Sequence, residues 1–232
     1  MERLQPWSVR AVNLPDHADN VVHTDQGARA AGFEAALVAG TTVYAYLTHP
    51  VVAAWGQEWV ASGGGELRLR RPVLHDDLVV CTPVGDQIDA CVDGEARATL
   101  LPFPQGPTLA ADRGESIGIF DVTVGEAQAD YGLRAGDDLT LYAEEGISHP
   151  VTWLNLANTA FIRHFVDGPW VHVRSRFSHA QLVSQNAELS IETRLVRRFD
   201  SRAGKRVEAD VIIRCDGKPA VTIEHEAIMT LA

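Results

Sequence analysis

The stretch GARAAGFEAALVAGTTVYAYLT, residues 27 to 48, decides the fold of the first half of this chain. Its large apolar side chains recur at spacings of three and four, which predicts a helix from about Gly27 to Thr48. From Ala35 onward the other face carries alanine and threonine rather than charge. A helix that is apolar nearly all round is enclosed by other elements, and Pro50 is expected to help end it.

Short alternating segments surround this helix and predict strands, because side chains of a strand point to opposite faces with a period of two. In the first half the expected strands are Ser8 to Val12, a strand through Leu67 and Leu69, Leu78 to Thr82, Gln87 to Val92 and Ala96 to Leu101. Turn signals separate them. The first half therefore reads as one helix followed by an antiparallel meander.

The second half repeats this design after a stretch rich in proline and glycine. We expect a helix over residues 149 to 165 and strands that begin at Ile117, Trp170, Glu188, Lys205 and Ala220. The predicted units are residues 1–101, a linker at 102–116 and residues 117–232. A long enclosed helix wrapped by an antiparallel sheet, occurring twice, is α+β organisation.

Composition excludes several functions. Lysine plus arginine number 20 against 31 aspartate plus glutamate, a net charge of −11, so nucleic acid is not expected as a partner. No apolar run is long enough to span a bilayer, and the N-terminus lacks the apolar segment of a signal peptide. The three cysteines show no metal or disulfide pattern. We therefore expect a cytoplasmic protein without membrane association.

The loop before the helix concentrates polar side chains, with Asp19, Asn20 and His23 among them. From the residues alone two interpretations stay open. The loop can be a catalytic cluster, or it can cap the next helix through Thr24 or Asp25, since these residue types are common N-caps.

The loop and the helix together resemble the MaoC-like dehydratases and R-specific enoyl-CoA hydratases. The matching text is AsnValValHisThrAsp at 20–25, GlyPhe at 32–33 and AlaLeuValAlaGly at 36–40, followed by ArgArgProValLeuHisAspAspLeuValVal at 70–80. GlyAspAspLeuThrLeuTyr at 136–142 resembles a degenerate second copy. The resemblance implies a tandem, or double, hot-dog fold with the active site between the two halves.

The first copy departs from the family pattern at its acidic position. The family places a carboxylate five residues before the histidine, where this chain has Ala18, and the nearest carboxylate is Asp19. Val21 stands where the family has proline. The role of Asp19 therefore depends on the local backbone, while the match at His23 is direct.

The resemblance implies hydration of an enoyl thioester, or the reverse dehydration, so we expect an acyl-thioester hydro-lyase. His23 and Asp19 would carry protons, and Asn20 would orient the water or His23. Backbone N–H groups at the start of the helix, near Gly40 and Thr41, would hold the developing enolate oxygen.

The expected substrate is an acyl-CoA or acyl-carrier-protein thioester, whose phosphates need local positive charge. Arg68 and Arg70, with Arg71, form one cluster on a predicted strand, although alternating arginines are more often the solvated face of a strand. No separate cofactor is expected. No metal site is expected either, because the histidines lack ligand spacing. His17 is expected to be a solvent-exposed loop residue, and exposed sheet edges would allow a homodimer.

Two other functions stay open. One is an acyl-CoA thioesterase, since AsnThrAlaPheIleArgHisPhe at 158–165 resembles a helix of the 4-hydroxybenzoyl-CoA thioesterases. The other is an inactive acyl-binding protein in which both motifs have decayed, as Ala18 and Tyr142 suggest.

Overall fold

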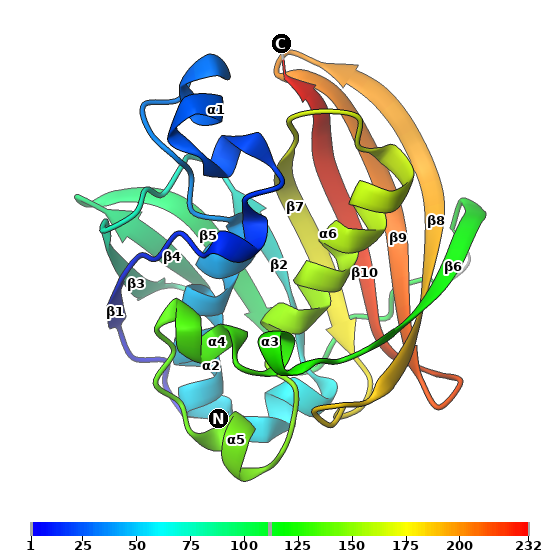
Figure 1. Cartoon of the computed structure of the whole chain (residues 1–232). Coiled ribbons are helices and arrows are strands. Elements are labelled where there is room, and N and C mark those ends of the chain that lie inside the picture. Colours follow the sequence, from blue (N-terminus) through cyan, green and yellow to red (C-terminus); the bar gives the residue numbers. More distant parts are fainter. Residues whose placement is uncertain (1, 111–112, 232) are drawn as a thin grey trace.

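The computed structural model describes residues 2–110 and 113–231, and in them one antiparallel sheet of ten strands packs around two long helices (Figure 1). The strands are β1 (Trp7–Arg10), β2 (Gly64–Leu69), β3 (Leu78–Val84), β4 (Gln87–Val92), β5 (Glu95–Phe103), β6 (Glu115–Thr123), β7 (Val171–His179), β8 (Glu188–Ser201), β9 (Gly204–Cys215) and β10 (Lys218–Leu231). The helices are α1 (Asp25–Ala30), α2 (Gly40–Ser62), α3 (Glu126–Ala129), α4 (Tyr131–Ala135), α5 (Leu141–Glu144) and α6 (Val151–Phe165), with short 3₁₀ helices at Pro15–His17 and Val21–His23.

The two halves of the sheet have matching strand orders, mirrored about the middle of the sheet. It reads β1-β3-β4-β5-β2-β7-β10-β9-β8-β6, so five strands from each part of the chain meet where β2 pairs with β7. Gly64 lies at this junction opposite Ser178. A Cβ on Gly64 would stand 2.4 Å from the carbonyl oxygen of Phe177, so the close pairing requires glycine there.

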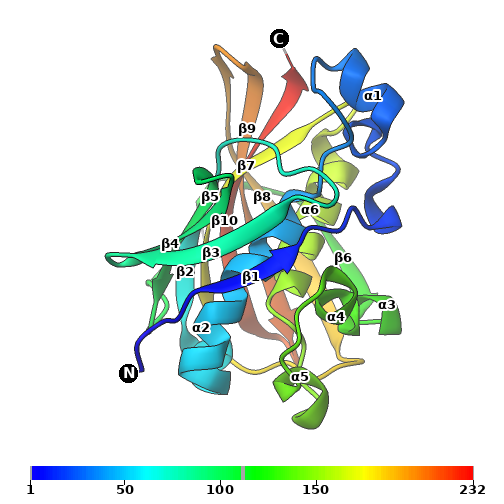
Figure 2. The same ribbon diagram turned by 90° about the vertical axis from the view of Figure 1, so that its left-hand side faces the viewer.

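Both long helices lie on the same face of the sheet, which curves around them (Figures 1 and 2). The side chains of α2 are buried without interruption from Thr41 to Val52, as an apolar-all-round helix requires. α6 begins two residues after its expected start and ends at the expected residue. No helix in the described part of the chain is long and apolar enough to cross a membrane.

The helix expected from Gly27 to Thr48 was wrong at both ends. α1 and α2 are separate helices, and α2 continues through Pro50 to Ser62 with a kink at Gly56, whose φ is 61°. Proline removes the hydrogen bond to the carbonyl four residues earlier. Here the Cys81 thiol donates to that carbonyl, on Tyr46, at 3.4 Å. A partner from β3 thus compensates for the missing N–H.

Candidate functional site

A pocket of about 390 Å³ lies between the two sets of strands, at the N-terminal end of α2. That volume suits a small-molecule site. From the first half of the chain, the pocket wall includes His17, Asp19, Asn20, His23, Gly40 and Arg70. From the second half, it includes Asn158 and Ile162 of α6, Trp170, Val171 and His172 at the start of β7, and Arg206 of β9. The structure therefore brings together most of the residues expected to form the site.

His23 is held in one orientation by the loop that precedes α2. Its Nδ1 donates to the carbonyl oxygen of Leu37 at 2.8 Å. Because a carbonyl only accepts, the neutral ring carries its proton on Nδ1 and has its lone pair on Nε2. Burial lowers the pKa of His23, opposed by the bond to Leu37. The ring is thus a neutral base near pH 7.

His17 is not the solvent-exposed residue expected from the sequence. Its ring lies 5.5 Å from that of His23, and its Nε2 lies 2.7 Å from the hydroxyl of Tyr131. That hydroxyl is also 2.6 Å from Oγ1 of Thr42. Burial, followed by the charge of His23, lowers the pKa of His17 to about 4. This loop histidine is half-buried because Tyr131 of α4, in the later half, contacts it.

The carboxylates near the pocket do not pair with His23. Asp19 is exposed on the pocket wall, and no hydrogen bond or ion pair joins its side chain to another described residue. Asp16 also reaches the wall, but Arg134 binds both of its oxygens, at 2.7 and 2.9 Å. Hydrogen bonds from Arg134 lower the pKa of Asp16. No Asp/His pair therefore forms among these residues.

Asn20 ties the loop that precedes α2 to the other half of the molecule. Its Nδ2 donates to the carbonyl oxygen of Trp170 at 3.0 Å, and its Oδ1 is buried with no partner in the described residues. The amide therefore orients the loop toward β7 and leaves an acceptor that a ligand or water can use.

The start of α2 supplies hydrogen-bond donors to the pocket. The first N–H groups of a helix have no intrahelical partner, and Gly40 is the first residue of α2. A Cβ on Gly40 would stand 2.3 Å from Cδ1 of Leu69, so the approach is close. The side chain of Thr41 is fully buried, 3.4 Å from the Tyr131 hydroxyl, and does not line the pocket. Only its backbone N–H is available for the expected role.

The expected arginine cluster is divided. Arg70 lines the pocket, as does Arg71. Arg68 does not line it, and both Arg68 and Arg174 bind Glu66 instead. Arg68 points away from the pocket because it alternates with Leu69 in β2, whereas Arg70 lies beyond the end of β2 and is not bound by this alternation.

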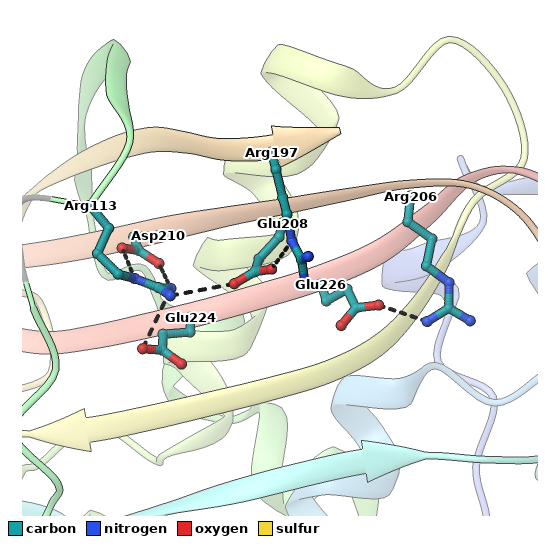
Figure 3. Close-up of polar contacts among 7 residues, drawn as sticks. All are labelled: Arg113, Arg197, Arg206, Glu208, Asp210, Glu224 and Glu226. Atoms are coloured by element: carbon teal, nitrogen blue, oxygen red, sulfur yellow. Dashed lines mark hydrogen bonds and ion pairs between the residues drawn. The ribbon is translucent and has the colours of Figure 1, made fainter. Parts of the chain in front are cut away.

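A second cationic region was missed in the sequence. A groove of about 1130 Å³ runs between α1 and the β8–β9 hairpin, and Arg198, Lys205 and Arg206 on its wall outnumber Asp167 and Asp200. Arg206 also lines the pocket beside His23, and its guanidinium binds Glu226 at 2.6 Å (Figure 3). The groove and the pocket therefore adjoin at Arg206.

The degenerate second motif forms a buried polar cluster outside the pocket. His149 Nε2 lies 2.9 Å from Asp137, which is 3% exposed, and the ring of Tyr142 lies 4.4 Å from that of His149. His49 Nε2 lies 2.7 Å from Asp138 and 3.9 Å from Asp137. His49, Asp137 and Asp138 are metal-ligand types, but these contacts explain their proximity.

His172 was missed because strand alternation gives the wrong face. In WVHVRSRF the valines occupy alternate positions, which predicts that His172 points outward with Arg174 and Arg176. The register of β7 on β10 shifts between Glu226 and Ala227, and this bulge at Val173 turns His172 inward. Irregular pairing of that kind leaves no local signal in the sequence.

Comparisons with known proteins establish the fold. No family model matches the sequence, and no curated protein matches it. A conserved hypothetical protein from Mycobacterium tuberculosis described as a double hotdog fold is similar with a TM-score of 0.67 at 11% identity, over 98% of this chain and 96% of that chain. A MaoC-like dehydratase is similar with a TM-score of 0.63 at 11% identity, over 99% of this chain and 99% of that chain. A protein named "oleoyl thioesterase (putative)" from Lactobacillus plantarum is similar with a TM-score of 0.55 at 10% identity, over 100% of this chain and 98% of that chain.

The chain therefore has a double hot-dog fold, as expected from the resemblance. The similarity to MaoC-like proteins is confirmed for the fold. At 10 to 11% identity the neighbours do not define the reaction, which must be argued from the site.

Proposed function

We propose that the protein adds water to an enoyl thioester, or removes it from a 3-hydroxyacyl thioester, in the pocket between its two halves. One observation supports this most: Nδ1 of His23 is fixed by Leu37, so a neutral base is present in the same pocket as the first N–H groups of α2. A base and an oxyanion donor are what the reaction requires.

In the hydration direction, Nε2 of His23 takes a proton from water as the water oxygen bonds to the β-carbon. The electrons of the double bond move toward the thioester, whose oxygen becomes an enolate beside the N–H of Gly40 and the positive end of the α2 dipole. The proton on His23 then passes to the α-carbon, and the carbonyl re-forms. Atoms and charge balance without a second acid.

The remaining polar groups position the water and the loop. Asn20 holds the loop against β7, and the contact of His17 with Tyr131 holds the second imidazole beside His23. Asp19 has no part in this scheme, because it is exposed and unbonded to described residues. In this scheme His17, rather than Asp19, is the polar side chain beside His23.

The phosphate-bearing arm of CoA or of a carrier protein would lie in the groove beside Arg198, Lys205 and Arg206. The groove adjoins the pocket at Arg206, and Lys205 is exposed. Arginine and lysine are the usual phosphate partners. This region replaces Arg68 as the expected phosphate contact and keeps Arg70 at the pocket.

A thioesterase is the second candidate, and Asn158 favours it. This residue belongs to the α6 segment that resembles thioesterase helices, and it lines the pocket. The same base could direct water to the carbonyl carbon, with the oxygen held by the same N–H groups. Thiol release distinguishes this reaction from hydration.

The test is turnover by the purified chain of enoyl-CoA, 3-hydroxyacyl-CoA and acyl-CoA panels, followed by loss of the conjugated chromophore and by thiol release. We expect chromophore loss, reduced about 10²-fold or more in His23→Ala. Asp19→Ala is the matched control from the same loop and should retain wild-type turnover. Thiol release alone would favour the thioesterase. Binding without turnover in the wild type would favour the inactive acyl-binding protein.

A further inference from the structure

Three buried side chains form a hydrogen-bonded row beside the pocket. Oγ of Ser175 lies 2.8 Å from Nε2 of His172 and 2.7 Å from Nδ1 of His225. The two imidazole rings stack with centroids 4.2 Å apart. His172 is 5% exposed, and Ser175 and His225 are fully buried. Neither catalysis by His23 nor packing explains why β7 and β10 carry this polar row in the core.

The serine links the protonation of the two rings. It has one proton to donate, so it donates to one histidine and accepts from the other. When it donates to Nε2 of His172, the neutral His172 ring carries its own proton on Nδ1. The proton on Nδ1 of His225 then completes the row by donating to Ser175. In this arrangement His172 presents a donor at Nδ1.

Nδ1 of His172 lies at the start of α2. It stands 3.5 Å from the point that a Cβ on Gly40 would occupy, and both residues line the pocket. Nδ1 is buried with no partner in the described residues. A buried polar atom left unpaired is costly, so a ligand oxygen that accepted from it would be stabilised.

Other buried histidine nitrogens also lack partners, but their surroundings differ. Nε2 of His225 belongs to a ring that meets the ring of Phe161 at 4.5 Å, and His179 packs between Trp59 and Phe177. Neither residue lines the pocket. Five described histidines have a buried ring nitrogen without a partner: His49, His164, His172, His179 and His225. Of these five, only His172 lines the pocket.

We propose that His172 is a second oxyanion donor, whose Nδ1–H and the backbone N–H of Gly40 together hold the thioester oxygen. Ser175 and His225 are positioning residues that set its tautomer. Cδ1 of Leu69 lies 2.3 Å from the same point beside Gly40, so the proposal requires the leucine side chain to change rotamer when the oxygen binds. The inference rests on the proposed thioester chemistry.

A neutral imidazole suits this role. Burial lowers the pKa of His172 to about 4. A neutral donor stabilises the enolate without the cost of a buried cation in the resting enzyme. The later half of the chain would thus complete the oxyanion site that α2 begins.

The test uses acetoacetyl-CoA, a 3-ketoacyl thioester whose enolate absorbs in the near ultraviolet. An oxyanion site lowers the pH at which the bound thioester ionises, so the enolate band reports the site without turnover. We expect an enolate band with the wild-type protein and at least a tenfold lower enolisation constant in His172→Leu. His172→Asn places an amide near the position of Nδ1 and should restore most of the band. Ser175→Ala should give an intermediate loss.

His179→Leu is the matched control, since His179 is a buried histidine of the same strand outside the pocket. It should keep the wild-type band. A wild type that binds acetoacetyl-CoA without the band, or a His172→Leu protein that binds it with the full band, overturns the inference. An intact band that depends on His172, in a protein that turns over no acyl thioester, overturns the proposed function and leaves the oxyanion site standing.

Discussion

At the scale of single residues, His23 and His17 predict the pH dependence of activity. Burial lowers the pKa of His23 below its usual 6.5, and that of His17 to about 4. The base is active when neutral, and a lowered pKa keeps it neutral in more acidic solution. We expect kcat/KM for enoyl-CoA to stay level from pH 8 to below 6.5 and then to fall. A half-maximal point at 6.5 would contradict the buried placement of His23.

The hydroxyl of Tyr131 predicts a selective effect on His17. It bridges Nε2 of His17 and Oγ1 of Thr42, so Tyr131→Phe removes the contact that orients the ring. We expect kcat to fall about tenfold, less than the roughly 10²–10⁴-fold that loss of an acid–base group itself costs. Thermal unfolding of Tyr131→Phe distinguishes this effect from a loss of fold. Thr42→Val, which removes the hydroxyl on the other side of Tyr131, is the control and should have a smaller effect on kcat.

At the scale of elements, helix α2 predicts a coupling between Pro50 and Cys81. Pro50 leaves the Tyr46 carbonyl without its helical partner, and the Cys81 thiol donates to it. In Pro50→Ala the backbone N–H returns, so Cys81→Ala should cost less there than in the wild type. A double-mutant cycle of urea unfolding should give a coupling of about 0.5–1 kcal/mol. Additive costs would show that the thiol does not satisfy the carbonyl.

The same helix shows how far the sequence predicts the molecule. Strong periodicity located both enclosed helices and most strands. The resemblance carried by GlyPhe and AlaLeuValAlaGly pointed to His23 and Gly40, which lie in one continuous segment and line the same pocket. The start of α2 was misplaced because local periodicity runs on across residues 31–39, where Leu37 instead pairs with Leu74. His172 depends on a bulge set by β10, a contact between segments far apart in the chain.

At the scale of the whole molecule, the segment that joins the two sets of strands is clamped to the sheet. Arg113 binds Asp210 through two hydrogen bonds and also contacts Glu208 and Glu224 (Figure 3). Asp210 is fully buried. Burial raises its pKa, opposed by the hydrogen bonds from Arg113.

Removal of this clamp should destabilise the fold. Arg113→Met leaves the buried carboxylate without its main partner, and we expect a loss of about 2 kcal/mol in the free energy of unfolding, below the range for fully buried pairs because Arg113 is partly exposed. Adding Asp210→Asn removes the unpaired buried charge, so the double variant should recover part of the lost free energy of unfolding, measured in urea. A single variant as stable as the wild type would show that the clamp is dispensable.

The buried histidines together predict how the whole fold responds to acid. Burial lowers the folded-state pKa values of His17, His172 and His179 to about 4, against an ordinary value of 6.5. Between these values the unfolded chain binds protons that the folded chain excludes, so stability falls as the pH falls through this window. Each histidine contributes a slope of about 1.4 kcal/mol per pH unit.

We therefore expect Tm to decrease steeply from pH 6.5 toward pH 4 and to change little above 6.5 from this cause. His179→Leu removes one of the groups responsible and lies outside the pocket. Its Tm should be lower than that of the wild type near neutral pH, because the contact with Trp59 is lost, but should depend less on pH. Equal pH slopes in the two proteins would mean that His179 is protonated in the folded state, which its burial between Trp59 and Phe177 opposes.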